Sequence, residues 1–120
     1  MRVLGDAVLD LAQLKDITMD DEELMREVLG VLLDDTGSQL LRLDAAIQAG
    51  DMPACRRLAH YSKGACANVG AGRAAAVCQR LEQYAINGEI AACSQSLAAL
   101  RGELDALRQE VAAFEGESPA

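Results

Sequence analysis

The chain has 120 residues, of which 51% are apolar but only 2% are aromatic, so its core must be built from Ala, Leu, Val and Ile. This length suits a single domain over residues 1–120, and the composition favours packed helices over sheets. The net charge of −8, from 11 basic and 19 acidic residues, argues against a nucleic-acid partner. No apolar run approaches the roughly 20 residues that span a bilayer, and Asp6 and Asp10 interrupt the stretch that a signal peptide would need. We therefore expect a cytoplasmic protein that binds no membrane.

The first two helices are predicted from their caps and their apolar spacing. A short helix is expected from a capping Asp6 to about Lys15. Its apolar side would hold Leu4, Val8, Leu11 and Ala12. A long helix is expected over about residues 21–49, because Asp20 and Glu23 have the spacing of a capping box at its start. Its apolar stripe recurs at helical spacing and comprises Met25, Val28, Leu29, Leu32, Thr36, Gln39, Leu43, Ala46 and Ile47.

The next two helices form a predicted hairpin. A third helix should run from a capping Asp51 to about Val69, with Pro53 in its first turn, where the missing N–H costs nothing. After a glycine-rich turn, a fourth helix should run from about Arg73 to a stop at Asn87. Its buried side would comprise Val77, Cys78, Leu81 and Ala85.

A fifth helix completes the predicted set. Its apolar residues are spaced by 3, 4, 3, 4, 3, 4 and 3 positions, a seam that packs against other helices at a shallow angle. They are Ile90, Cys93, Leu97, Leu100, Leu104, Leu107, Val111 and Phe114. Residues from about 115 onwards would form a frayed tail. These elements predict an all-α fold, an antiparallel four-helix bundle with a short extra N-terminal helix.

Four cysteines are distributed over the predicted helices without any CxxC pair. Cys55, Cys66, Cys78 and Cys93 each lie among Ala and Leu, which predicts reduced core side chains rather than disulfides. A di-iron bundle needs Glu-x-x-His pairs, and the chain has a single histidine. A covalent haem would need CxxCH, which is absent. We expect no metal and no cofactor in this chain.

The single histidine lies on the outward side of the third helix. On a helical wheel the small and apolar residues gather on the opposite side. They are Cys55, Leu58, Ala59, Ser62, Ala65, Cys66 and Val69. His60 shares its half of the helix with Arg56, Arg57 and Lys63, all within about one turn. These cations would favour a dianionic phosphoryl group on the ring, although a plain surface histidine would show the same exposure.

Small residues follow His60 along the same strip. Gly64 lies one turn later in mid-helix, where glycine costs about 1 kcal/mol relative to alanine. Its missing side chain leaves the imidazole open to the site of another protein, and Ala67 continues the smooth strip. A neutral imidazole is a competent nucleophile near neutral pH. Access and chemistry therefore both favour a functional His60.

The segment Ala59-His60-Tyr61-Ser62-Lys63-Gly64 resembles the Ala-His-x-Leu-Lys-Gly signature of the histidine-containing phosphotransfer (HPt) family. The similarity extends over about residues 8–112. It implies a bundle in which His60 accepts a phosphoryl group from a receiver aspartate or a histidine kinase and passes it to another receiver. Lys63 and Gly64 match positions tied to charge stabilisation and access. Ser62 departs from the pattern, since the family has Leu there, and its hydroxyl could bond the carbonyl of Leu58.

The resemblance also implies the partners, which are response-regulator receiver domains and a hybrid sensor histidine kinase in a two-component phosphorelay. The chain has no Walker loop and no glycine-rich nucleotide loop, so we expect a carrier and not an enzyme with its own ATP site. Mg²⁺ is expected only in the partner receiver. Met1 suggests a free-standing chain, and we expect a monomer. The rival hypothesis is a helical adaptor that binds a signalling partner without phosphotransfer.

A docking surface for the partner is predicted beside His60. On the second helix Leu33, Gly37 and Leu41, with Leu40, fall beside or off the core stripe and would form an apolar strip. Arg56, Arg57 and Ala67 would flank it. Burial of the strip under the first helix or beside the fourth is the alternative.

Overall fold

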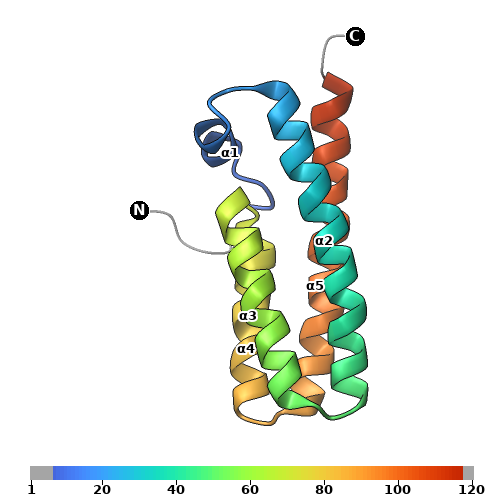
Figure 1. The fold of residues 1–120 in the computed structure, drawn as a ribbon. Coiled ribbons are helices and arrows are strands. Elements are labelled where there is room, and N and C mark those ends of the chain that lie inside the picture. Colours follow the sequence, from blue (N-terminus) through green and yellow to red (C-terminus); the bar gives the residue numbers. More distant parts are fainter. Residues whose placement is uncertain (1–6, 118–120) are drawn as a thin grey trace.

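The computed structural model describes residues 7–117, and the side chains of residues 7–113. This part of the chain is built from helices alone (Figure 1). The helices are α1 (Leu11–Ile17), α2 (Glu22–Gln48), α3 (Met52–Val69), α4 (Gly72–Ile86) and α5 (Ile90–Glu117). The four long helices lie side by side, α3 packs against α2 and α4, and α1 crosses one end of the bundle (Figure 1). The predicted fold class is confirmed.

Aspartates cap the helices that position the site. The side chains of Asp21 and Asp51 accept hydrogen bonds from Leu24 N and Ala54 N, each at 3.1 Å, at the starts of α2 and α3. Asp51 was predicted correctly. The assignment of the α2 cap to Asp20 was wrong by one residue, because Asp20 has a φ of +61° and not the extended backbone of a cap.

The first helix begins later than its sequence suggests. Asp10, not Asp6, caps α1 by accepting a bond from Gln13 N at 3.1 Å. Residues 7–10 instead run across the α3–α4 turn, where Asp10 N donates to Gly70 O at 2.8 Å. Gly70 ends α3 with a φ of +91°, and a Cβ there would lie 2.9 Å from Asp10 O. This close approach fixes the path of the segment. Asp6 and Leu4 lie outside the described residues.

Helix α1 is attached through few side chains. Leu14 is fully buried, whereas Leu11, which was expected on the apolar side, is 42% exposed. Gln13 Nε2 donates to the carbonyl of Ala67 at 2.7 Å, which ties α1 to the end of α3. The sequence pattern missed Leu14 because Val8 precedes the helix, so a stripe drawn through Val8 and Leu11 does not describe a face of α1.

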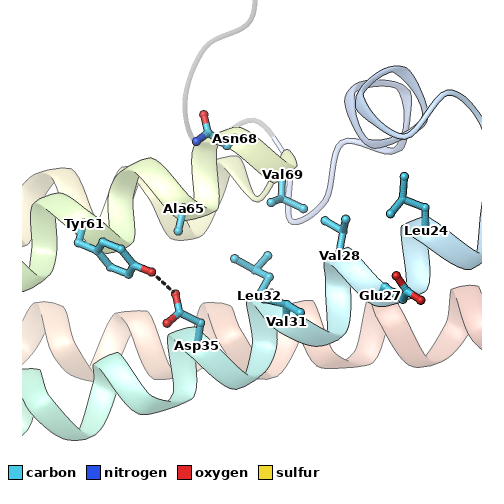
Figure 2. A pocket seen from close by; sticks show the side chains of 10 residues that line it. All are labelled: Leu24, Glu27, Val28, Val31, Leu32, Asp35, Tyr61, Ala65, Asn68 and Val69. Atoms are coloured by element: carbon cyan, nitrogen blue, oxygen red, sulfur yellow. Dashed lines mark hydrogen bonds between the residues drawn. The ribbon is translucent and has the colours of Figure 1, made fainter.

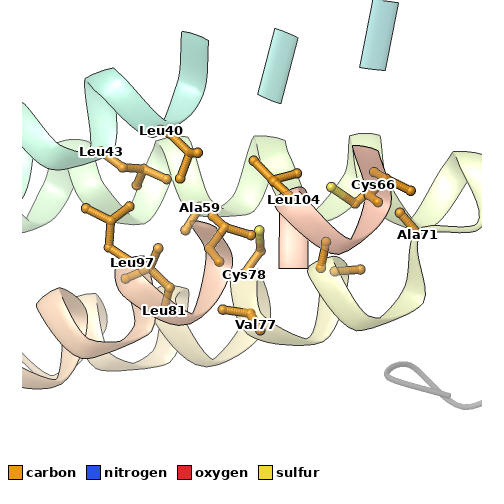
Figure 3. Close-up of a cluster of buried hydrophobic side chains, with 14 of the residues drawn as sticks. Leu40, Leu43, Ala59, Cys66, Ala71, Val77, Cys78, Leu81, Leu97 and Leu104 are labelled. Carbon is orange, nitrogen blue, oxygen red and sulfur yellow. The ribbon is translucent and has the colours of Figure 1, made fainter. Parts of the chain in front are cut away.

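The core follows the predicted stripes closely. Figure 3 shows leucines of α2 and α5 meeting small side chains of α3 and α4. The residues labelled there are Leu40, Leu43, Ala59, Cys66, Ala71, Val77, Cys78, Leu81, Leu97 and Leu104. Alanine and cysteine occupy little volume, so the axes of α3 and α4 approach each other closely. Among the expected seam positions whose side chains the structure describes, Ile90 differs, because this first residue of α5 is 47% exposed. The side chain of Phe114 lies outside the described part.

The buried polar and thiol groups complete the core. All four cysteines are buried and free, as predicted. Burial raises the pKa of the Cys55 thiol to about 12, which leaves it protonated and inert at neutral pH. The expected bond from Ser62 to the Leu58 carbonyl does not form. The Ser62 hydroxyl is buried without a hydrogen-bond partner among the described residues.

Helix α5 continues through Glu117, so no tail begins at residue 115 as expected; residues 118–120 are outside the described part. In the described part of the chain, no helix combines the length and the apolarity that crossing a bilayer requires.

Candidate functional site

His60 stands on the outer side of α3 because the opposite side belongs to the core. Cys55, Ala59, Ser62 and Cys66 recur at intervals of three and four residues and are all buried. His60 projects away from them, and 68% of its side chain is exposed. The predicted exposure is confirmed, so a protein partner can reach the imidazole without any unfolding of the bundle.

Glu82 of α4 links His60 to Lys63. One of its carboxylate oxygens lies 2.9 Å from His60 Nδ1, and the other lies 3.0 Å from Lys63 Nζ. The side chain of Glu82 is only 12% exposed. We call these three residues the His60–Glu82–Lys63 cluster. It spans the seam between α3 and α4, where the small core residues let the two helices approach.

The cluster determines which ring nitrogen is available. Burial of the Glu82 carboxyl would raise its pKa, but hydrogen bonds from Lys63 and His60 outweigh burial and hold the pKa below its ordinary value. Glu82 is therefore a carboxylate at neutral pH, and a carboxylate only accepts hydrogen bonds. The ring hydrogen of a neutral His60 must then lie on Nδ1, which leaves the lone pair on Nε2 for nucleophilic attack.

Lys63 lies one helical turn after His60 and is partly buried. Its ammonium group carries three hydrogens, and the contact with Glu82 uses one of them. The remaining hydrogens are available to an anionic group placed on the imidazole. Stabilisation of the transferred charge by Lys63 remains a prediction. The structure shows in addition that Lys63 and His60 contact the same carboxylate, that of Glu82.

Gly64 opens the surface next to His60. A Cβ built on Gly64 would meet nothing within 4 Å, so this glycine is not required by close helix packing. Ala67, one turn further on, is half-buried, and its carbonyl accepts the bond from Gln13 of α1. The smooth strip predicted after His60 therefore ends where α1 lies against α3.

The two predicted flanking arginines are both exposed but lie on different sides of α3. Arg56 precedes His60 by one turn. Arg57 instead lines a hollow between α2 and α3, together with Arg42. Neither arginine forms an ion pair with any residue that the structure describes. Their part in docking remains a prediction.

The apolar strip predicted on α2 is not a continuous exposed surface. Leu40 is 8% exposed and belongs to the core, and Leu33 is half-buried against it. A Cβ at Gly37 would lie 3.6 Å from Arg108 of α5, so Gly37 is on the side away from α3. Only Leu41, at 73% exposure, stands free on the surface. Small errors in the rotation of a long helix move such positions from one face to the next.

An apolar groove does exist between α2 and α3, one face away from the expected strip. Figure 2 shows Val28, Val31 and Leu32 of α2 opposite Ala65 and Val69 of α3. A hydrogen bond from Tyr61 Oη to the Asp35 carboxylate, 2.9 Å long, crosses one end of this groove.

The sequence did not reveal the roles of Glu82, Asp35 and Tyr61. Glu82 lies within the stretch of about residues 8–112 that resembles the family pattern, but no local signal links it to His60. A carboxylate and a histidine that are 22 positions apart meet only once the offset of α4 against α3 is known. Among the described side chains, no group of three or more His, Cys, Asp or Glu is arranged to hold a metal ion.

Comparisons with known proteins agree with this geometry. The family model described as Hpt domain matches residues 27–110, which is 84 of the 120 residues. Histidine-containing phosphotransfer protein B from Pseudomonas aeruginosa superposes with a TM-score of 0.86 at 28% identity, covering 95% of this chain and 99% of that one.

A histidine-containing phosphotransfer protein from maize shares the fold, with a TM-score of 0.79 at 23% identity, covering 92% of this chain and 86% of that one. No curated protein sequence matches the chain. The family match spans α3, α4 and the whole His60–Glu82–Lys63 cluster. The chain belongs to the Hpt-domain family, the phosphotransfer carriers of two-component signalling.

Proposed function

We propose that His60 is the phosphoacceptor of this carrier. It takes a phosphoryl group from the phosphorylated aspartate of a receiver domain, or from a hybrid sensor histidine kinase, and passes the group to another receiver. The observation that carries the proposal is the exposed His60 ring with Nδ1 held 2.9 Å from the Glu82 carboxylate. This arrangement presents Nε2 to solvent as the nucleophile.

The transfer needs no proton to move in the bundle. The Nε2 lone pair forms a bond to phosphorus while the P–O bond of the receiver's acyl phosphate breaks, and that electron pair stays on the receiver's aspartate. The ring keeps its hydrogen on Nδ1 and becomes positively charged. Glu82 lies against that hydrogen, so its negative charge offsets the charge that develops on the ring. The same step in the opposite direction transfers the phosphoryl group from His60 Nε2 to the aspartate of a second receiver.

Lys63 and Gly64 have supporting roles in this step. Lys63 would donate to a phosphoryl oxygen, which its position one turn after His60 supports. Gly64 would leave room for the rim of the receiver's site, which the open space around its Cβ position supports. Mg²⁺ and the acidic cluster that binds it would belong to the receiver. The same proposal includes a cytoplasmic monomer that lacks an ATP site and acts only with its partner proteins.

The experiment is to incubate the chain with each phosphorylated receiver of its source organism. Transfer should be rapid with a few of them, and ³¹P–¹⁵N NMR should find the phosphoryl group on Nε2 of the single histidine. An adaptor without phosphotransfer would bind a receiver and remain unlabelled. Phosphorylation on Nδ1 would contradict the role proposed for Glu82, because that nitrogen is then not held by the carboxylate.

A further inference from the structure

The contact between His60 and Glu82 also bears on the phosphorylated form of the ring. A phosphoryl group on Nε2 uses the lone pair of that nitrogen, so Nδ1 becomes the ring nitrogen that can gain or lose a hydrogen. Nδ1 lies 2.9 Å from the Glu82 carboxylate, which α4 brings to the histidine of α3. The charge of the phosphorylated ring therefore depends on Glu82.

Only one form of the phosphorylated ring is complementary to Glu82. A carboxylate accepts hydrogen bonds and donates none. When Nδ1 carries a hydrogen, the ring is cationic and donates a charge-assisted bond to Glu82. When Nδ1 lacks that hydrogen, two lone pairs face each other across 2.9 Å. Glu82 thus favours the cationic form.

The charged groups around the ring come from three helices. They are Arg56, Arg57 and Lys63 of α3, Glu82 of α4, and Asp35 of α2, which is bonded to Tyr61. Although burial alone would raise the pKa of Glu82, its hydrogen bonds with Lys63 and His60 hold that pKa below the ordinary value, so the carboxylate stays ionised. The cations of α3 are offset by the phosphoryl group itself, which carries nearly two negative charges at neutral pH. The carboxylate is the group in contact with Nδ1, and its preference for the cationic ring is retained.

A cationic ring is the better leaving group from phosphorus. When water attacks phosphorus, the N–P bond breaks and its electron pair returns to Nε2. The cationic ring then leaves as a neutral imidazole with its hydrogen still on Nδ1, and the water oxygen and both of its hydrogens end in dihydrogen phosphate. A neutral ring would have to leave as an imidazolate anion, which is far less stable. Water reaches this site freely, because 68% of the His60 side chain is exposed and the space beside Gly64 is open.

We propose that Glu82 limits the lifetime of the phosphoryl group on His60 by keeping the phosphorylated ring cationic. This inference rests on the proposed function and concerns the regulation of the same site. Glu82 acts through the ring and is therefore a positioning residue. The carrier gives up its phosphoryl group readily to a receiver and loses it to water when no receiver takes it. A phosphorylated carrier thus returns to the free form after its donor stops.

The test labels the chain with phosphoramidate, a small chemical donor that needs no receiver, and follows the decay of Nε2-phosphohistidine by ³¹P NMR. An ordinary imidazole has a pKa of about 6.5 and is neutral at about pH 8. Glu82→Gln removes the charge but keeps an oxygen that accepts from Nδ1–H, and its amide can also donate to Nδ1 without a hydrogen. At about pH 8 the label should last about fivefold longer in Glu82→Gln than in wild type. The pH profile of its decay should shift to lower pH.

Glu103→Gln is the matched control. Glu103 is another largely buried carboxylate, and it pairs with Arg73 at 3.1 Å between α5 and α4. This variant makes the same change in net charge and should leave the lifetime of the label unchanged. A second measurement needs no variant: unfolding labelled wild type in concentrated urea at about pH 8 separates His60 from Glu82, so the label should last longer than in the folded chain.

Three results would overturn the inference. They are an equal lifetime in wild type and Glu82→Gln at every pH, an equal lengthening in Glu103→Gln, and a label in folded wild type that outlasts the label in urea. If receivers still label His60 in those cases, the proposed function stands without this inference. The predicted difference in lifetime, together with no labelling by any receiver, would support the role of Glu82 and contradict the proposed function.

Discussion

Substitutions of Gly64 test whether this glycine is needed for access to His60 or for helix packing. A Cβ at Gly64 meets no atom within 4 Å, so Gly64→Ala introduces no clash. Glycine in mid-helix costs about 1 kcal/mol relative to alanine, because the unfolded chain loses more backbone entropy. The variant should therefore be stabilised by up to about 1 kcal/mol, which for a domain of this size raises Tm by about 4 °C.

A larger side chain at the same place should oppose function without harming the fold. Gln is a good helix former, so Gly64→Gln should also melt at or above the wild-type Tm. Its side chain would cover the approach to His60 and slow phosphotransfer by about tenfold or more. Stability and transfer rate then move in opposite directions, as expected of a residue kept for access.

Two other glycines serve as controls. Gly102 is exposed in mid-α5 and also has open space around its Cβ position, so Gly102→Gln should stabilise the bundle and leave transfer unchanged. Gly70→Ala should destabilise it, because φ is +91° and Asp10 O lies 2.9 Å from the new atom. Thermal melts and transfer rates on the four variants decide the matter. A Gly64→Gln variant that melts several degrees below wild type would refute the reasoning and place this strip in the core.

The other predictions concern the His60–Glu82–Lys63 cluster. Long-range ¹H–¹⁵N NMR of the single histidine should find the Nδ1–H tautomer predominant in wild type and in Glu82→Gln, whose amide oxygen still accepts, but lost in Glu82→Ala. Predominance of Nε2–H in wild type would contradict the assignment. Lys63→Ala should slow transfer without unfolding the bundle, and an unchanged rate at both low and high salt would make Lys63 a plain surface residue. Because the pKa of Glu82 is lower in the folded protein, its carboxylate stabilises the fold fully above the ordinary value of 4.5 and loses that effect as pH falls through the folded value. Urea unfolding of wild type against Glu82→Gln across this range should show the difference fading toward acid, and a constant difference would argue against the ion pair.

The sequence was sufficient for the four long helices and for the exposure of His60. Apolar spacing of three and four residues and the Asp51 cap are local signals, and local signals determine where a helix lies and which side it buries. The position of His60 opposite Cys55, Ala59 and Cys66 therefore followed directly. Similarity to the HPt signature added the role of the histidine, which periodicity alone left open.

Local sequence signals could not predict the contacts between helices. Glu82 reaches His60 only because α3 and α4 pack closely with a particular offset, and that offset depends on every small residue of their interface. The α1 boundary shifted for a similar reason, since Asp10 is held by Gly70 of another helix. On α2 the expected strip was placed on the wrong face, because Leu33 and Leu40 are taken up by the core.

Transfer of labelled phosphate from a phosphorylated receiver to the wild-type chain and to His60→Gln tests most directly whether His60 is the acceptor. His60 is exposed, and its replacement removes no core contact, so the variant should fold normally. Wild type should acquire a label that is lost in acid and stable in base, as a phosphoramidate is, and His60→Gln should acquire none. Unchanged labelling of His60→Gln, or a label on wild type that survives acid, would contradict phosphotransfer through His60.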